Sequence, residues 1–217
     1  MKMSTFFNIF QIPTITYGIT VCNEVNELKK LLTILIPLIS KNDEIIILQD
    51  VTNENKAVTD LIAQFKSVRR IEAQLNGDFS AFKNTLIKMA RKKYLFQIDA
   101  DEYPQVGLIK GLKLFLWKNL QSDCFLVPRI NIVDGITEQD LENWKWKKNE
   151  DGYINFPDFQ TRILKLNGKI QWKNKVHETL INYNKLKAMP TKNYDFCLIH
   201  KKEINRQRNQ NAFYDKL

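Results

Sequence analysis

The sequence predicts an α/β protein with a doubly wound, mostly parallel sheet flanked by helices, followed by a smaller mixed α/β region. Short apolar runs of strand length alternate with segments whose apolar residues recur at the helical period. Polar or acidic residues come directly after most of these runs. The chain has 217 residues, of which 44% are hydrophobic, so it is long enough for one sizeable core.

The first hundred residues alternate strand and helix in a regular order. Strands are expected at 14–22, 44–49, 70–75 and 94–98, and helices at 23–36, 57–65 and 80–91. This order is typical of a parallel sheet with right-handed crossovers. The apolar residues with helical spacing, which we expect to be buried, are Leu28, Leu31, Leu32 and Leu35 in the first helix and Phe82, Leu86 and Met89 in the third.

The second half of the chain is less regular. We expect a helix at 104–120, a strand at 124–133, a polar loop at 134–155, and a hairpin of strands 161–166 and 169–172. A short strand ending at His200 and a basic terminal helix should follow. We divide this single domain into a regular first half, residues 1–103, and a less regular second half, residues 104–217, which ends in the basic helix.

Four polar clusters follow the predicted strands. They are Asn23-Glu24, Asp50, Asn76-Gly77 and the acidic run Asp99-Ala100-Asp101-Glu102. Ligands of open parallel sheets bind outside the carboxyl ends of the strands, so these clusters should converge on one edge. The carboxylates of the acidic run would repel one another unless water or a cation lies between them. Residues i and i+2 of an extended chain point to one side, which suits a metal ion.

Composition narrows the class of partner. Residues 143–217 contain 16 Lys and Arg against 7 Asp and Glu, whereas 1–142 are balanced. A basic surface attracts nucleic acid, anionic lipid or acidic glycan, although it can also be ordinary solvated surface. The three cysteines are widely spaced and form neither a disulfide framework nor a zinc pattern, so we expect a reducing, cytoplasmic setting. The apolar N-terminal stretch lacks the features of a signal peptide, and no segment has the length of a membrane span.

Several ordered motifs resemble the family 2 glycosyltransferases, which have the GT-A fold. The stretches "ITVCNEVNELKKLL", "DEIIILQDVTNENK" and "NGDFSAFKNTLIKMARKKYLFQIDADE" resemble the nucleotide-sugar-binding half of that family. The stretch "INFPDFQTRILKLNGKIQWKNKVHETL" resembles a non-processive branch with Pro-Asp-x-Gln-x-Arg and Val-His-Glu motifs. The resemblance covers roughly residues 14–200. It departs from the family at "VTNENK", which replaces a common Gly-Ser-x-Asp, and at Lys83, which replaces an Arg.

The resemblance implies a metal-dependent, inverting transfer of a sugar from a nucleotide-diphosphate sugar to an acceptor hydroxyl. It implies that Mn²⁺ or Mg²⁺ is held by Asp101, with Asp99 and His200 as further candidates. It also implies that residues 1–103 bind the nucleotide-sugar donor and that residues 104–217 form the acceptor-binding and catalytic half. Its candidate donor-binding residues are Asn23, Glu24, Asp50, Asn76, Lys83 and Asp99.

A transfer of this kind needs a carboxylate to take the acceptor proton. Glu178 is the preferred candidate and Asp158 the alternative. Arg162, His177 and Trp172 are candidate contacts to the acceptor or the diphosphate. Each of these residues also has an ordinary structural interpretation, as a helix-end, surface or core side chain.

Two features of the acceptor side remain open. The basic last third favours an anionic acceptor such as a glycan or a lipid-linked sugar, and hydroxymethylated DNA is an alternative. The basic C-terminus would also suit peripheral contact with the inner face of a membrane. The other functions that we consider are a sugar-phosphate nucleotidyltransferase, which usually has a Gly-rich loop after the first strand, and a non-catalytic nucleic-acid-binding module.

Overall fold

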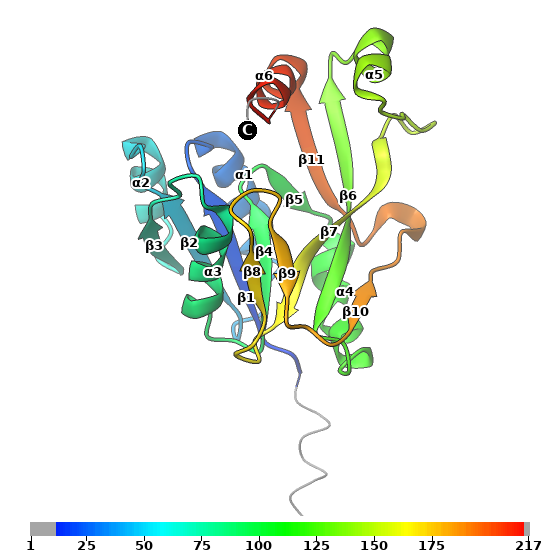
Figure 1. Ribbon diagram of the computed structural model, residues 1–217. Coiled ribbons are helices and arrows are strands. Elements are labelled where there is room, and N and C mark those ends of the chain that lie inside the picture. The colour runs from blue at the N-terminus through cyan, green and yellow to red at the C-terminus, as the bar shows by residue number, and fades with distance from the viewer. Residues whose placement is uncertain (1–11, 215–217) are drawn as a thin grey trace, which may run out of the picture.

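The computed structural model describes residues 12–214 and shows one large sheet with helices on both faces (Figure 1). The segment on which the signal-peptide expectation depends lies almost entirely outside the described residues. The large sheet has nine strands, which are β1 (Ile15–Val21), β2 (Glu44–Asp50), β3 (Val68–Ala73), β4 (Tyr94–Asp99), β5 (Glu102–Pro104), β6 (Cys124–Asp134), β7 (Ile154–Lys165), β10 (Leu186–Ala188) and β11 (Leu198–Glu203).

The remaining elements surround this sheet. The helices are α1 (Val25–Leu35), α2 (Lys56–Ala63), α3 (Phe79–Met89), α4 (Val106–Lys118), α5 (Glu138–Trp144) and α6 (Ile204–Tyr214). A second sheet pairs β8 (Gln171–Lys173) with β9 (Thr179–Ile181), and a 3₁₀ turn spans Lys192–Tyr194. Both α5 and α6 lie beyond the ends of β6 and β11, at one end of the sheet (Figure 1).

The strand order confirms the predicted fold class. The order is β3-β2-β1-β4-β7-β6-β11-β5, and β1 pairs in parallel with both β2 and β4, as β2 does with β3. Strand β7 is antiparallel to its neighbours β4 and β6, and β11 runs parallel to β6. The sheet is therefore mostly parallel in its first half and mixed in its second.

Strand β2 shows why its sequence is continuously apolar. Ile45 and Ile47 pack into the core formed with α1, α2 and α4, whereas Ile46 and Leu48 pack into a second core with α3. Successive side chains point to opposite faces, and both faces are covered by helices. Every residue from Ile45 to Asp50 is consequently buried.

Three expectations about local structure are wrong. Met89 is 39% exposed because it lies in the last turn of α3, beyond the edge of the core. The expected loop 134–155 contains α5, which begins at a capping box in which Thr137 and Asp140 satisfy each other's backbone N–H groups.

The third concerns the expected hairpin. Strand β7 is twelve residues long and pairs with β4 and β6, while β8 pairs with β9. Long-range pairing along β7 outweighs the local turn signal at Asn167-Gly168.

A search for membrane spans finds that none of the helices between residues 12 and 214 combines the length and the apolar character needed to cross a bilayer.

Candidate active site

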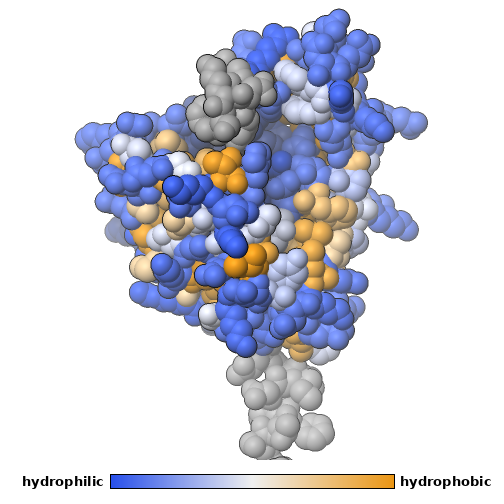
Figure 2. Space-filling view, viewed as in Figure 1, coloured by the Kyte–Doolittle hydropathy of each residue, from blue (hydrophilic) through white to orange (hydrophobic). Residues whose placement is uncertain are grey.

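A cavity of about 870 Å³ opens at the carboxyl ends of the parallel strands. Its wall is formed by residues that follow β1, β2 and β4, by β6 and β7, and by β11 and α6 from the end of the chain. The site is therefore built by segments from both halves of the sequence. The side of the molecule drawn in Figure 2 is mostly hydrophilic, with its apolar residues in small separate groups.

Most of the residues singled out in the sequence lie in the wall of this cavity. Those that it brings together are Glu24, Asp50, Lys83, Asp99, Asp101, Asp158, Arg162, His177, Glu178 and His200. Among the described residues, Asn23, Asn76 and Trp172 are not part of the wall. Three of the four expected polar clusters therefore converge, and the turn after β3 contributes Leu75 in place of Asn76.

The three residues outside the wall have other surroundings. Asn23 is exposed beside Glu24, whose carboxylate accepts hydrogen bonds from the backbone N–H groups of Cys22 and Asn23. Asn76 is exposed in a turn with a φ of 46°. Trp172 is a core residue that is 7% exposed, and its indole Nε1 donates to Gln97 Oε1 at 2.8 Å.

Asp50 closes the turn that follows β2. Its Oδ1 accepts hydrogen bonds from the Thr52 backbone N–H at 2.9 Å, the Thr52 hydroxyl at 2.6 Å and the Leu75 N–H at 3.1 Å. Burial alone would raise the pKa of Asp50, but these hydrogen bonds lower it below its ordinary value. Asp50 therefore stays ionised and joins the ends of β2 and β3.

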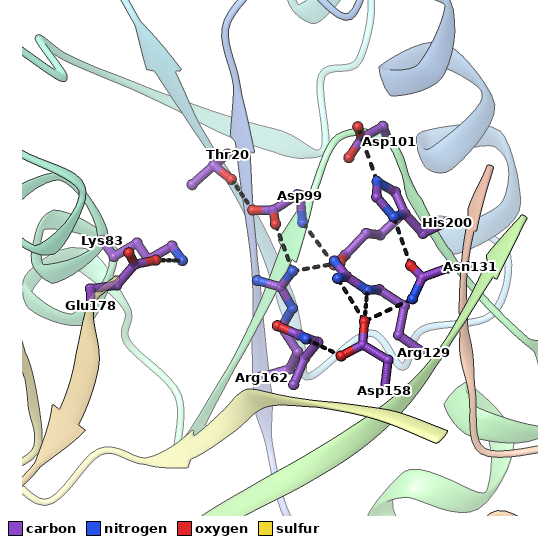
Figure 3. Close-up of polar contacts among 12 residues, drawn as sticks. Thr20, Lys83, Asp99, Asp101, Arg129, Asn131, Asp158, Arg162, Glu178 and His200 are labelled. Carbon is purple, nitrogen blue, oxygen red and sulfur yellow. Dashed lines mark hydrogen bonds and ion pairs between the residues drawn. The ribbon is translucent and has the colours of Figure 1, made fainter. Parts of the chain in front are cut away.

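The carboxylate of Asp99 is held from two sides. The Thr20 hydroxyl donates to Oδ1 at 2.7 Å, and Arg162 donates from Nη2 to Oδ2 at 2.6 Å (Figure 3). Burial would raise the pKa of Asp99, but the positive charges of Arg162 and Lys83 lower it far below its ordinary range. Its negative charge is therefore balanced within the protein.

Glu102, which the sequence suggests is only a flanking residue of the acidic run, is fully buried. Its Oε1 accepts from Arg162 at 2.5 Å and from Arg129 at 2.9 Å, and its Oε2 lies 3.3 Å from the Asp99 backbone nitrogen. Burying a charge is costly unless it is paired, and two arginines provide the pairing here. Glu102 thereby fixes the turn that carries Asp99 and Asp101.

Asp158 lies on β7 at the opposite end of the same network. Arg129 donates to its Oδ2 from Nε at 2.9 Å, Asn131 donates to Oδ2 at 2.8 Å, and Gln160 donates to Oδ1 at 2.6 Å. Burial would raise the pKa of Asp158, but the charge of Arg129 and these hydrogen bonds lower it. Both of its oxygens are already engaged.

Asp101 and His200 face each other across the cavity wall. His200 Nε2 lies 3.5 Å from Asp101 Oδ2, and His200 Nδ1 lies 3.0 Å from Asn131 Oδ1 (Figure 3). Arg206 of α6 also reaches Asp101 Oδ2 at 3.5 Å and contacts Glu24 at 3.2 Å. Burial would raise the pKa of Asp101, but the neighbouring His200 lowers it.

The carboxylate of Asp101 and the imidazole of His200 are ligands that suit a hard or borderline divalent cation. No group of three or more His, Cys, Asp or Glu side chains placed to bind a metal ion occurs among residues 12–214. Asp101 and His200 nevertheless present one carboxylate oxygen and one ring nitrogen to each other. Mg²⁺ and Mn²⁺ often take one or two protein ligands and complete their coordination with phosphate oxygens and water.

Lys83 and Glu178 form an ion pair at the side of the cavity. Lys83 projects from α3 and Glu178 from the segment before β9, and their side chains are 15% and 16% exposed (Figure 3). The Lys83 ammonium also lies 5.0 Å from the centroid of the Trp172 ring, within cation–π distance. His177, with a φ of 53°, lines the cavity next to Glu178.

Sequence reasoning missed several polar residues of the cavity wall, among them Thr20, Arg129, Asn131, Lys202 and Arg206. Arg129 and Asn131 are two residues apart on one strand, as are Asp158 and Gln160, so strand alternation would have placed each pair on one face. Arg206 carried no signal, because only the packing of α6 brings it to Asp101.

An α/β sheet with a charged cavity at the carboxyl ends of its parallel strands has its ligand-binding site where open α/β proteins bind their ligands. The glycosyl transferase family 2 model matches residues 16–201. The chain belongs to this family, as its sequence motifs predicted.

Relatives and solved structures agree with this membership. The chain is 30% identical over 177 residues to the SPbeta prophage-derived glycosyltransferase SunS of Bacillus subtilis (strain 168), and equally to the glycosyltransferase SunS of Bacillus phage SPbeta. These matches cover 79% of this chain but only 36% of each relative, so the chain spans about a third of their length.

The fold is shared with S. aureus TarS. The crystal structure of TarS 1–349 superposes with a TM-score of 0.60 at 13% identity, covering 87% of this chain and 60% of that one. The structure of TarS 1–349 in complex with UDP-GlcNAc gives a TM-score of 0.59 at 14% identity, covering 87% and 58%. This likeness establishes a common GT-A architecture.

Proposed function

We propose that the chain is a glycosyltransferase that moves a sugar from a nucleotide-diphosphate sugar to an acceptor hydroxyl. The observation that carries this proposal is the single cavity wall in which Asp99, Asp101, Lys83 and Arg162 meet at the carboxyl ends of β1, β2 and β4. The relatives' name, glycosyltransferase, and the UDP-GlcNAc complex of TarS support it, and a uridine diphosphate donor is the first choice.

Residues 1–103 supply the donor side in this proposal, and 104–217 the acceptor side. Asp50 and Glu24 line the end of the cavity formed by β1 and β2, where the nucleoside would lie. Asp99 would contact the ribose. Lys83 would contact the diphosphate, because it is the cation on α3 that lines the cavity.

Mn²⁺ or Mg²⁺ would be held by Asp101 and His200. When bound, such a cation neutralises the charge that develops on the departing diphosphate. The structure alters the role expected for Asp99 in this site, since both of its oxygens are already hydrogen-bonded, to Thr20 and Arg162. We therefore assign Asp99 to positioning and ribose contact rather than to direct coordination.

Glu178 is the proposed base of an inverting displacement. In that step the acceptor oxygen forms a bond to the anomeric carbon, the bond to the diphosphate breaks, and the acceptor proton passes to the carboxylate. Asp158 is less suited, because Arg129, Asn131 and Gln160 already donate to its oxygens. Glu178 forms an ion pair with Lys83, which the donor diphosphate would attract away.

We further propose an anionic acceptor, such as a glycan or a lipid-linked sugar, and a cytoplasmic site of action with peripheral contact at a membrane. The support is the charge of residues 143–217, which hold 16 Lys and Arg against 7 Asp and Glu. Lys145 and Lys147 are exposed just before β7, whose residues line the cavity. An anionic acceptor would bind less tightly as salt is raised.

A donor screen tests the proposed function. Hydrolysis of UDP-, GDP-, TDP- and CDP-sugars would be followed with Mn²⁺, with Mg²⁺ and with a chelator, in the wild type and in Asp101→Asn. We expect slow, cation-dependent hydrolysis of one nucleotide class, with UDP first, and its loss in the variant. Hydrolysis of none of these donors would overturn the proposal, and nucleotide transfer to a sugar phosphate would replace it with a nucleotidyltransferase.

A further inference from the structure

Asn131, which lines the cavity, connects two other residues of the site. It lies on β6, directly beside His200 of the parallel strand β11, with which it is in register. Its amide spans the gap between the Asp158 carboxylate and the His200 ring (Figure 3). The strand register therefore fixes the amide between an anion and an imidazole.

The chemistry of its neighbours determines which way this amide points. Asp158 Oδ2, 2.8 Å from Asn131 Nδ2, also accepts hydrogen bonds from Arg129. An ionised carboxylate can only accept hydrogen bonds, so the NH₂ group of Asn131 must face it. The amide oxygen is thereby directed at His200 Nδ1, 3.0 Å away. An amide oxygen can only accept, so Nδ1 must carry the hydrogen.

The orientation of the other ring nitrogen follows. With the hydrogen on Nδ1, the neutral ring presents the lone pair of Nε2 to Asp101 Oδ2 at 3.5 Å. Two acceptor atoms that face each other at this distance repel unless a positive species lies between them, and that species is either a second proton on Nε2 or a metal cation. When the ring is neutral, the pair is therefore arranged to be closed by a metal cation.

We propose that Asn131 is a positioning residue that holds His200 in the Nδ1–H tautomer, so that Nε2 and Asp101 together receive a divalent cation. The proposal deepens the proposed function, because it rests on the cation role given there to Asp101 and His200. Hydrogen bonds to the second nitrogen of a metal-binding histidine set its tautomer and ring orientation.

Ion pairs and hydrogen bonds around Asn131 hold its neighbours in place. Arg129 joins Asp158 to the fully buried Glu102, with Nη1 2.9 Å from Oε1. Glu102 in turn holds the backbone of the turn that carries Asp101 through its contact with the Asp99 nitrogen. The same network of Arg129, Asp158 and Glu102 therefore positions both Asn131 and Asp101. The separation between His200 and Asp101 depends on this network.

The first test reads the tautomer of His200 in the wild-type protein. The chain has two histidines, so nitrogen-15 spectra of the metal-free protein contain two ring systems, and His177→Gln assigns them. When its ring is neutral, His200 should show a protonated Nδ1 and an unprotonated Nε2. A neutral ring with its hydrogen on Nε2 in the wild type would overturn the proposal, whatever the protein's activity.

The second test uses Asn131→Leu, which keeps the size of the side chain and removes both hydrogen bonds. We expect His200 to lose its tautomer preference and Mn²⁺ affinity, measured by electron paramagnetic resonance without donor, to fall about 10- to 100-fold. Gln160→Leu is the matched control, since it removes a hydrogen bond to Asp158 and leaves the amide of Asn131 in place. In Gln160→Leu, the tautomer of His200 and the Mn²⁺ affinity should stay close to those of the wild type.

The possible outcomes are distinct. If Asn131→Leu keeps the His200 tautomer and the Mn²⁺ affinity, the positioning role is wrong. If Gln160→Leu weakens Mn²⁺ as much as Asn131→Leu does, the effect belongs to Asp158 in general and the proposal is also wrong. None of these measurements uses turnover, so a failed donor screen would overturn the proposed function and leave this inference to be judged separately.

Discussion

The guanidinium of Arg162 on β7 binds the carboxylate of Asp99 at the end of β4, with Nη2 2.6 Å from Oδ2. The same Nη2 lies 2.5 Å from Glu102 Oε1. Arg162 and Glu102 are both buried, so neither charge can be solvated if its partner is removed. This arginine therefore supports the fold and the site together.

Arg162→Met should destabilise the protein by about 3–5 kcal/mol, because it leaves the buried charge of Glu102 with one arginine instead of two. Urea unfolding followed by circular dichroism measures this loss. Lys56→Gln is a suitable control, since Lys56 and Asp60 form an exposed ion pair worth well under about 1 kcal/mol. Equal stability of the two variants would contradict the role given to Arg162.

Stability should fall as the solution is acidified. Asp50, Asp99, Asp101 and Asp158 all have a pKa below the ordinary value in the folded protein. The stabilisation that they provide is complete above their unfolded pKa of about 4 and is lost as pH falls through the lower folded values. Urea midpoints measured between neutral and acid pH should decline below that point, and a midpoint that rises on acidification would contradict the assignment.

Glu178→Gln should reduce turnover by ~10²-fold or more, the usual scale for loss of a general base, with donor affinity near that of the wild type. Single-turnover kinetics with a saturating donor separates the two quantities. Asp158→Asn is the comparison variant. If Asp158→Asn removes turnover in this manner and Glu178→Gln does not, the roles of the two carboxylates are exchanged.

Arg206→Gln should strengthen Mn²⁺ binding in the donor-free protein. The Arg206 guanidinium lies 3.5 Å from Asp101 Oδ2, so it competes with a cation for the same oxygen. Removing its charge should raise Mn²⁺ affinity about fivefold, which corresponds to ~1 kcal/mol for unit charges 4 Å apart in water. Arg208→Gln is the matched control on the same helix, because Arg208 pairs with Asp140 of α5. Unchanged affinity in Arg206→Gln would show that the arginine and the cation do not compete.

Binding to lipid vesicles tests the proposed membrane contact. If the basic charge of residues 143–217 faces a membrane, the protein should sediment with vesicles that contain anionic lipid and be released by high salt. Replacing the exposed Lys185 and Lys187 with Gln, and Lys145 and Lys147 in a second variant, shows which surface is responsible. Equal binding to neutral vesicles would exclude an electrostatic contact.

The sequence by itself determined the first half of the fold. Continuous apolar runs such as 45–48 require cover on both faces, and helical spacing in α1 supplies that cover from neighbouring residues. These signals are local, so the strands and helices up to β4 could be predicted together with the polar residues at the strand ends. The family motifs likewise follow the chain in order, and the family model matches the same region.

Tertiary structure alone decided how the charges are paired. Arg129 reaches Glu102 from β6 and Arg206 reaches Asp101 from α6, and no spacing in the sequence brings them there. Strand β7 pairs with β4 and β6 across long separations, which replaced the expected hairpin. The sequence specifies which side chains can carry charge, but long-range packing decides which of them meet, because a buried ion must find its partner wherever the sheet places one.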